Sequence, residues 1–408
     1  MEPSLVVESA GIRFSNPFML SSAPPTTTPE MIGRAFEAGW GGAVIKTLAY
    51  DLDLVRNVDP RIHSVRRDGL VIGFSNIELG SNRPVDLWIE DIRSLKKQYP
   101  DRVLLASLLH TEGLIREQWI EVAGKCAEAG IDGLELNFSC SHGMAEGGGG
   151  AVVGQSPELI RRVLGWVREV TDKPVFVKLP AGVENLPQKA QAALQAGASA
   201  ISAINTLNCL PGIDVYNFTP YPAVDGKGAF GGLSGTAIKP VGLRCVAQIA
   251  QRVRIPISGI GGIGTWHDAV EYILAGASTV QVCSAVMLAG YRIVEDLCEG
   301  MLDYMRQMGF ARISDFVGLA LKNIVKHNSL SRDYKLVSTV DASTCTRCGL
   351  CAIVCRDSAY QAIVLDEMRM PVIDEQKCDG CGLCVQICPV PGCMALREKT
   401  AEQLEGLK

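Results

Sequence analysis

The chain has 408 residues, of which 47% are hydrophobic and 20% charged, and its formal net charge is −5. This ordinary globular composition excludes a mostly disordered chain, and an acidic balance disfavours a nucleic-acid binder, because phosphate contacts need clustered Lys and Arg. The start of the chain lacks the basic and apolar regions of a secretory signal, and its longest apolar stretch, Ile273–Met287, is too short and too polar to span a bilayer, so we expect a cytoplasmic protein.

Over the first 310 residues, short apolar segments alternate with amphipathic ones. Eight segments read as strands: Pro17–Ser21, Gly42–Lys46, Val103–Leu108, Gly133–Phe138, Pro174–Leu179, Ala200–Ile204, Ile255–Gly259 and Thr279–Cys283. Helical patterns are predicted at Pro29–Ala38, Ile115–Ala129, Ser156–Val170, Pro187–Ala196, Ala237–Arg252, Trp266–Ala275 and Tyr291–Met308. Several helices end in Ala-Gly, a typical C-cap before the next strand. The alternation favours an α/β fold, a (β/α)₈ TIM barrel spanning residues 1–328.

The composition changes after this region. Residues 329–343 are polar and lack helical periodicity, so we predict a linker. Residues 344–398 contain an internal repeat and are predicted to form a small α+β dicluster ferredoxin-like domain, followed by a frayed tail at 399–408.

The repeat is a cysteine pattern, C-x2-C-x2-C-x3-C, which occurs twice with a displacement of 33 residues. This spacing is typical of dicluster ferredoxins, in which the fourth cysteine of each motif ligates the other cluster. It predicts two [4Fe–4S] clusters, one held by Cys345, Cys348, Cys351 and Cys388 and the other by Cys378, Cys381, Cys384 and Cys355. Zinc sites are the alternative, but they prefer paired cysteines separated by a longer spacer. Arg356 replaces the proline that often follows the fourth cysteine, and the extra Cys393 is expected to be a small buried residue.

Iron–sulfur clusters carry single electrons, so a fused catalytic barrel needs a centre that exchanges one electron with a cluster and two with a substrate. Flavin meets this requirement. Gly259, Gly261 and Gly264 match G-x-G-x-x-G, but the acidic residue of a dinucleotide-binding fold is missing about 20 residues later. The loops after strands 7 and 8 of a barrel bind phosphate instead. Gly261, Gly262, Cys283 and Ser284 therefore fit an FMN phosphate, although a plain tight turn is also possible.

Polar residues gather at the predicted strand ends, where barrel enzymes place their chemistry. These residues are Ser21, Ser22, Lys46, Thr47, Asn137, Ser139, Cys140, Lys178, Asn205 and Thr206, with Asn76 and Glu78 in a predicted loop after the second strand.

The segments KTLAYDLDLVRNVDPRI, SNIEL, NFSCSHGM, VKLP, INT and QVCSA, followed by the cysteine repeat, resemble dihydropyrimidine dehydrogenase over nearly the whole chain. The barrel is also similar to dihydroorotate dehydrogenase. The first resemblance implies reduction of the 5,6 double bond of uracil or thymine, and the reverse reaction, in pyrimidine degradation. It also implies a hetero-oligomer, because bacterial versions of this kind carry FAD and the NAD(P) site on a separate partner subunit.

The resemblance also implies roles for individual residues. Cys140 is the implied proton donor, with His142 as a rival, and Gly147–Gly150 suggest a lid. The implied substrate-binding residues are Asn76, Asn137, Phe138, Ser139, Asn205 and Thr206. The implied FMN-binding residues are Ser22, Lys46, Thr47, Lys178, Gly235, Ile260, Gly261, Gly262, Cys283 and Ser284.

Two other functions remain open on the sequence. A dihydroorotate dehydrogenase would need a cation directed at the substrate carboxylate, and an electron-transfer module would have an inert barrel. A flavoenzyme acting on tRNA is disfavoured by the acidic charge balance.

Overall fold

A computed structural model describes residues 2–53, 55–109, 115–140, 150–182 and 184–400. The chain divides into two compact units between Asn323 and Ile324, five residues before the predicted barrel boundary at 328. Each unit is described by itself below.

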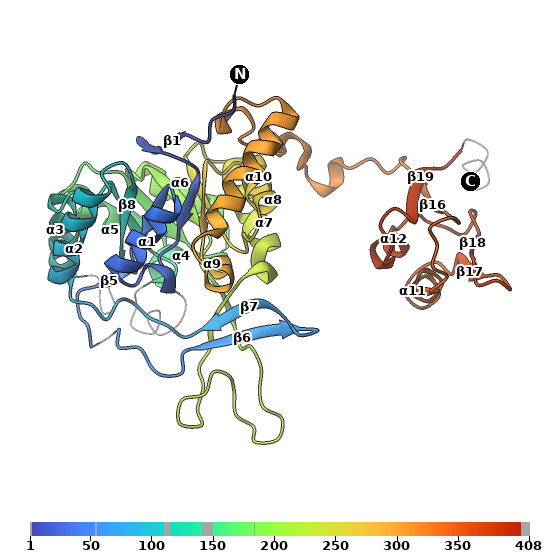
Figure 1. The fold of residues 1–408 in the computed structure, drawn as a ribbon, viewed down its shortest axis with the longest axis horizontal. Helices are drawn as coiled ribbons and strands as arrows, with labels where there is room; N and C mark the ends of the chain where they lie inside the picture. Colours follow the sequence, from blue (N-terminus) through green and yellow to red (C-terminus); the bar gives the residue numbers. More distant parts are fainter. Residues whose placement is uncertain (1, 54, 110–114, 141–149, 183, 401–408) are drawn as a thin grey trace. The chain divides into compact units, whose positions relative to one another are not determined.

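Eight parallel strands in the described part of the first unit close into a barrel, which confirms the predicted fold (Figure 1). In their order around the barrel they are β3 (Phe18–Leu20), β4 (Gly42–Val44), β8 (Val103–Leu109), β9 (Gly133–Asn137), β10 (Val175–Leu179), β11 (Ala200–Ala203), β14 (Ile257–Ile260) and β15 (Thr279–Val282). Both faces of these strands are buried, and their sequences are therefore almost continuously apolar. The short β5 (Leu48–Ala49) extends the pairing along β8.

The seven predicted helices are present around the barrel (Figure 1). They are α1 (Pro29–Ala38), α3 (Arg116–Glu128), α5 (Pro157–Arg168), α6 (Leu186–Gln195), α7 (Lys239–Ala250), α8 (Trp266–Leu274) and α10 (Ile293–Met308). The Ala-Gly segments adopt the left-handed conformation expected of C-caps, with φ of 110° at Gly39 and at Gly276.

In the described part of the first unit, three helices were not predicted: α2 (Val85–Gln98), α4 (Ala151–Gln155) and α9 (Ser284–Ala289). The signal for α2 is present in the sequence, since Trp88, Ile92 and Leu95 recur at helical spacing and are buried. The other two have only five and six residues, too few for a periodic pattern.

A four-stranded antiparallel sheet lies beside the barrel and was also missed (Figure 1). It contains β6 (Ile62–Arg67), β7 (Leu70–Asn76), β12 (Leu207–Cys209) and β13 (Gly231–Ser234). Asn76, which was placed in a loop, is therefore the last residue of β7. Strands distant in sequence meet here because glycine allows close contact: a Cβ at Gly73 would lie 2.3 Å from the carbonyl oxygen of Ser234.

The remaining elements of the first unit are short. A two-stranded ribbon pairs β1 (Val7–Ser9) with β2 (Ile12–Phe14). The 3-10 turns are η1 (Pro24–Thr26), η2 (Thr236–Ile238), η3 (Ile313–Asp315) and η4 (Leu321–Asn323), with η5 (His327–Ser329) in the second unit. Within the described residues, no helix has both the length and the apolar character needed to cross a membrane.

The described part of the second unit contains two antiparallel strand pairs and two α-helices. β16 (Leu336–Val340) pairs with β19 (Met394–Glu398), and β17 (Ile363–Leu365) with β18 (Pro371–Ile373). Helices α11 (Leu350–Ser358) and α12 (Leu383–Ile387) each follow a glycine with positive φ, Gly349 and Gly382.

Two details differ from the predicted boundaries of the second unit. β16 lies inside the segment 329–343 that composition marked as a linker, and its Val337 is fully buried. Lys399, in the predicted tail, donates its backbone N–H to Lys335 across the sheet. Long-range strand pairing, which local composition does not report, orders both segments. Residues 401–408 of the predicted tail lie outside the described residues.

Candidate active site

A cavity of about 430 Å³ opens at the carboxyl ends of the barrel strands. Its volume is typical of a site for a small molecule or cofactor. It brings together most of the residues to which the sequence assigned a role: Ser22, Lys46, Thr47, Asn76, Asn137, Cys140, Lys178, Asn205, Thr206, Gly235, Ile260, Gly261, Gly262, Cys283 and Ser284. The site thus draws on strands from almost the whole circumference of the barrel.

Phe138 and Ser139, expected to bind substrate, are not among the described residues that line this cavity. Phe138 is fully buried and packs edge-to-face against Trp119, with the ring centroids 6.0 Å apart. The reason is the alternation of side chains along an extended segment, which sends Phe138 to the opposite side from Asn137.

Ser139 instead connects two amides of the site. Its hydroxyl donates to Asn137 Oδ1 over 2.7 Å and accepts from Asn205 Nδ2 over 2.9 Å. Asn137 Nδ2 also donates to Thr47 Oγ1. These contacts orient the two carboxamides, each of which can donate and accept in one plane. The arrangement suits a ring with alternating N–H and C=O groups.

Cys140 lies just beyond the end of β9 and is buried against Ala49, Val55 and Leu109. Its carbonyl oxygen accepts a hydrogen bond of 2.8 Å from the backbone N–H of Ala151. Gly150 lies directly against it with φ of 52°, and a Cβ there would be 2.4 Å from the Cys140 oxygen. His142 and Gly147–Gly149 lie outside the described residues. The hydrogen bond from Ala151 and the close contact at Gly150 hold the backbone of Cys140 in place.

Replacing Gly150 by Ala should lower turnover about 10- to 100-fold, because the added methyl displaces the Cys140 backbone and small misplacements at a reacting centre are costly. The matched control is Gly165→Ala: Gly165 lies inside α5 and a Cβ there meets nothing within 4 Å. We expect this control to retain full turnover. Equal rates for the two variants, measured on preparations with similar melting temperatures, would show that the contact does not position Cys140.

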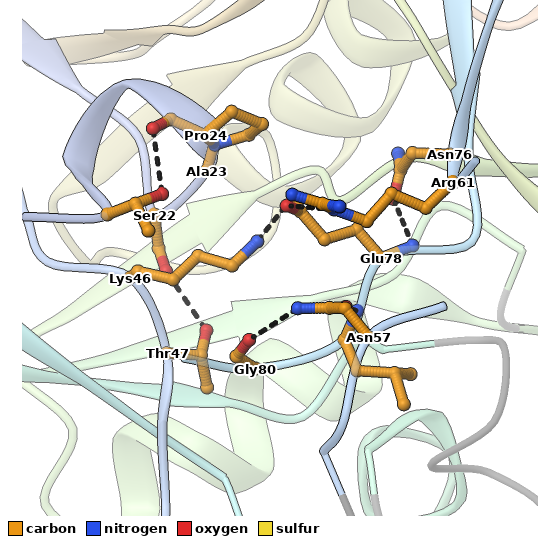
Figure 2. Close-up of polar contacts among 12 residues, drawn as sticks. Ser22, Ala23, Pro24, Lys46, Thr47, Asn57, Arg61, Asn76, Glu78 and Gly80 are labelled. Carbon is orange, nitrogen blue, oxygen red and sulfur yellow. Dashed lines mark hydrogen bonds and ion pairs between the residues drawn. The ribbon is translucent and has the colours of Figure 1, made fainter. Parts of the chain in front are cut away.

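Lys46 and Glu78 form a buried ion pair at one wall of the cavity, as Figure 2 shows. Lys46 Nζ lies 2.6 Å from Glu78 Oε2, and Arg61 Nε approaches the other carboxylate oxygen at 3.2 Å. Sequence reasoning noted Glu78 but gave it no role. The role of Glu78 as a counter-ion could have been inferred from Lys46, since a buried ammonium requires a carboxylate partner.

A second buried pair lies deeper in the barrel. Lys178 Nζ is 3.3 Å from Glu135 Oε1, with side chains 5% and 0% exposed. This is an ion-pair distance, although the atoms are not aligned for a hydrogen bond. Glu135 was missed in the sequence; its signal was an acidic residue inside the apolar strand GLELN, two positions before Asn137 and therefore on the same face.

The glycine-rich end of the cavity is held rigidly. Gly261 and Gly262 have φ of 126° and 72°, and the buried Tyr272 hydroxyl donates to the Gly261 carbonyl over 2.7 Å. A Cβ at Gly262 would lie 2.8 Å from the Gly235 oxygen. Any side chain larger than glycine would fill this turn, so its shape fits a phosphate group. Lys46 and Lys178, which line the same cavity, fit the flavin ring of FMN.

The N-terminus of α8, in contrast, is already occupied by the protein. Asp268 Oδ2 accepts the backbone N–H groups of Gly264 and Thr265 at 3.0 and 2.9 Å. Burial alone would raise the pKa of Asp268, but Lys239 at 2.6 Å and these donors bring it below its usual value. This helix terminus is therefore capped by a carboxylate of the protein itself.

Cys283 also lines the cavity, and its buried thiol keeps its proton at neutral pH. Burial raises the pKa of its thiol to about 11.

The cysteines of the second unit converge in two groups. One small cavity is lined by Cys345, Cys348, Cys351 and Cys388, together with Cys393. The other is lined by Cys355, Cys378, Cys381 and Cys384. The grouping is the one that the spacing predicts, with the fourth cysteine of each motif crossing to the other site. Four converging thiols at each site fit a [4Fe–4S] cubane.

The two cysteine sites differ in their hydrogen bonds to sulfur. At the second site, the backbone N–H of Ser338 donates to Cys378 Sγ and that of Ala362 to Cys355 Sγ. The Ser338 hydroxyl also lies 2.8 Å from Cys384 Sγ. At the first site, the backbone N–H of Arg347 donates to Cys345 Sγ. Hydrogen bonds to sulfur are one of the factors that set a cluster's potential, so the two sites provide different surroundings for their clusters.

Comparison with known proteins places these features in context. The family model "Dihydroorotate dehydrogenase" matches residues 4–305, and "4Fe-4S dicluster domain" matches residues 338–396. The chain is 40% identical over 371 residues to the NAD-dependent dihydropyrimidine dehydrogenase subunit PreA of Escherichia coli (strain K12), covering 89% of this chain and 88% of that protein.

Two further relatives have similar sequence identity to this chain. The chloroplastic dihydropyrimidine dehydrogenase (NADP(+)) of Arabidopsis thaliana is 38% identical, covering 82% of this chain and 81% of its own. The catalytic subunit of dihydroorotate dehydrogenase B (NAD(+)) of Pyrococcus abyssi (strain GE5 / Orsay) is 37% identical, covering 78% of this chain and 99% of its own. The matches to dihydropyrimidine dehydrogenases thus extend over more of this chain.

Proposed function

Since the chain belongs to the dihydroorotate dehydrogenase family and to the dihydropyrimidine dehydrogenases within it, and is an oxidoreductase of pyrimidine chemistry, we propose that it interconverts uracil or thymine with the 5,6-dihydropyrimidines. The family implies FMN in the barrel and iron–sulfur clusters in the second unit.

The observation that carries this proposal is the charge balance of the cavity. The cationic side chains lining it within the described residues are Lys46 and Lys178, and each is paired with a carboxylate, Glu78 and Glu135. A site with compensated cations favours an uncharged ring. Dihydroorotate carries a carboxylate and would need an uncompensated cation directed at it. The geometry therefore favours uracil or thymine over the alternative substrate.

We assign the chemistry to the chain's own residues as follows. Asn76, Asn137, Asn205 and Thr206 bind the ring edges, and the Ser139 hydroxyl keeps two of these amides oriented. FMN, when bound against Lys46, Lys178 and the glycine turn, supplies the two-electron chemistry. Negative charge develops toward the C4 oxygen as C6 receives hydride, and Cys140 donates the proton to C5 as a general acid. The buried walls around Cys140 keep water from this proton transfer.

We propose that electrons from NAD(P)H reach the barrel through a partner subunit that carries FAD, and then through two [4Fe–4S] clusters held by the eight converging cysteines. The complex would be a hetero-oligomer. Its support is the similarity to a protein named as a subunit and the cysteine geometry of the second unit.

The test is a comparison of substrates on the purified chain. With the flavin reduced by an artificial donor without oxygen, we expect uracil or thymine to reoxidise it rapidly and orotate to do so at least about tenfold more slowly. NADH or NADPH alone should give no turnover. Faster reoxidation by orotate would establish the dihydroorotate dehydrogenase activity instead, and no reoxidation by any pyrimidine would indicate an electron-transfer module.

Replacing Glu78 by Gln should shift this preference. The variant leaves Lys46 without its carboxylate at 2.6 Å, so a cation faces the cavity and a carboxylated ring gains a partner. We expect the ratio of orotate to uracil affinity to rise about tenfold or more, equivalent to about 1.4 kcal/mol, measured by flavin absorbance titration. Glu78→Asp keeps the charge and is the control. An unchanged ratio in Glu78→Gln would show that charge compensation at Lys46 does not select the substrate.

A further inference from the structure

The ion pair inside the barrel contains one residue that lines the cavity and one that lies behind it. Lys178 on β10 is part of the wall, whereas Glu135 on β9 is absent from the described lining residues and is completely buried. Glu135 can therefore act on a ligand only through neighbours that line the cavity, and among these Lys178 is the one that carries a charge.

The carboxylate of Glu135 is held in place from the side opposite the lysine. Its Oε2 accepts hydrogen bonds from Ser202 Oγ at 2.7 Å and from Gln281 Nε2 at 2.9 Å. These partners lie on β11 and β15, so two other strands of the barrel fix the carboxylate that β9 carries. These hydrogen bonds hold the carboxylate with its other oxygen 3.3 Å from Lys178 Nζ.

No other described acid of the cavity is placed to replace it. The acidic side chains that line the cavity are Glu78 and Asp268, and they pair with Lys46 and Lys239. Without Glu135, Lys178 would be a buried ammonium with no counter-ion. A group in that position is expected to give up its proton, because burial disfavours the charged form.

We propose that Glu135 is a positioning residue that keeps Lys178 protonated beside the flavin in both oxidation states. This deepens the proposed function and rests on it only in assuming that flavin occupies the cavity. Reduction of the flavin to its anionic reduced form then takes up two electrons and one proton, and Lys178 exchanges none. Without the carboxylate, Lys178 is neutral beside oxidised flavin and binds a proton when the flavin gains charge, so two protons accompany two electrons.

The test is the pH dependence of the midpoint potential of the bound flavin. Glu135→Gln should double the slope relative to the native protein, because the proton count rises from one to two per electron pair. Glu135→Asp restores a carboxylate and should return the slope toward the native value. Ser202→Ala, which removes one hydrogen bond to Glu135 without changing charge, should leave the slope unchanged. A single slope shared by the native protein and Glu135→Gln would overturn the proposal.

A second measurement needs no flavin. In the apoprotein, Glu135→Gln removes the counter-ion of Lys178 and Lys178→Met removes that of Glu135, whereas the double variant leaves no ionisable group of the pair behind. We expect the double variant to lose less melting temperature than the sum of the two single losses. Additive losses would show that the residues are not coupled and would overturn the inference. A native protein that binds no flavin but shows the coupling would instead contradict the proposed function alone.

Discussion

Replacing Cys140 by Ala is expected to lower the rate at which uracil reoxidises the reduced flavin by roughly 10²- to 10⁴-fold, the usual contribution of a positioned general acid. Cys140 is the thiol at the end of β9 where the oriented amides of Asn137 and Asn205 also meet. The barrel should stay intact, because the side chain belongs to a small cluster with Ala49, Val55 and Leu109 that is separate from the main core.

Two steps can be measured separately: the reduction of the flavin, and the transfer of electrons and a proton to the pyrimidine. Flavin reduction by an artificial donor should proceed at the native rate in Cys140→Ala, and only the step that consumes the pyrimidine should slow. Cys298→Ala, a change of the same kind on α10 and outside the cavity, is the control and should keep the native rate. A loss smaller than tenfold in Cys140→Ala would move the proton-donor role to another group, with His142 the first to replace.

Replacing Cys351 or Cys384 by Ser should disconnect the barrel from its electron supply. Each residue lines a different four-cysteine site, and both are buried. Loss of one ligand is expected to reduce the iron content from about eight atoms per chain toward about four. Turnover that depends on the partner subunit should fall by at least about 10²-fold, because in the proposed path the clusters are the single-electron carriers between that subunit and the flavin.

The same variants should keep the chemistry of the barrel. Flavin reduced directly by an artificial donor should still be reoxidised by uracil at the native rate, since the barrel and the second unit are separate compact units. Cys393→Ala is the matched control: Cys393 lines the first site but is not in the predicted ligand set, so iron content and visible absorbance should not change. Loss of iron in this control would place Cys393 among the ligands. Native iron content in Cys351→Ser would remove Cys351 from them.

Local sequence pattern was enough to predict the strands of the barrel, most of its helices and the grouping of the cysteines. Each of these depends on residues close together in the chain: apolar segments of strand length, Ala-Gly caps, and cysteines two or three residues apart. The (β/α)₈ barrel then followed from counting strands, and the polar residues at the carboxyl ends of those strands indicated where the cavity lies.

The charges of the cavity were decided only by the tertiary structure. Lys46 meets Glu78 across 32 positions and Lys178 meets Glu135 across 43, and no local pattern states which carboxylate reaches which ammonium. The four-stranded sheet beside the barrel, which places Asn76, joins segments more than a hundred residues apart in the same way. Pairing of this kind depends on which strands become neighbours when the barrel closes. The fold could therefore be predicted from local periodicity, whereas the two ion pairs on which the proposed preference for an uncharged ring rests exist only once the barrel has formed.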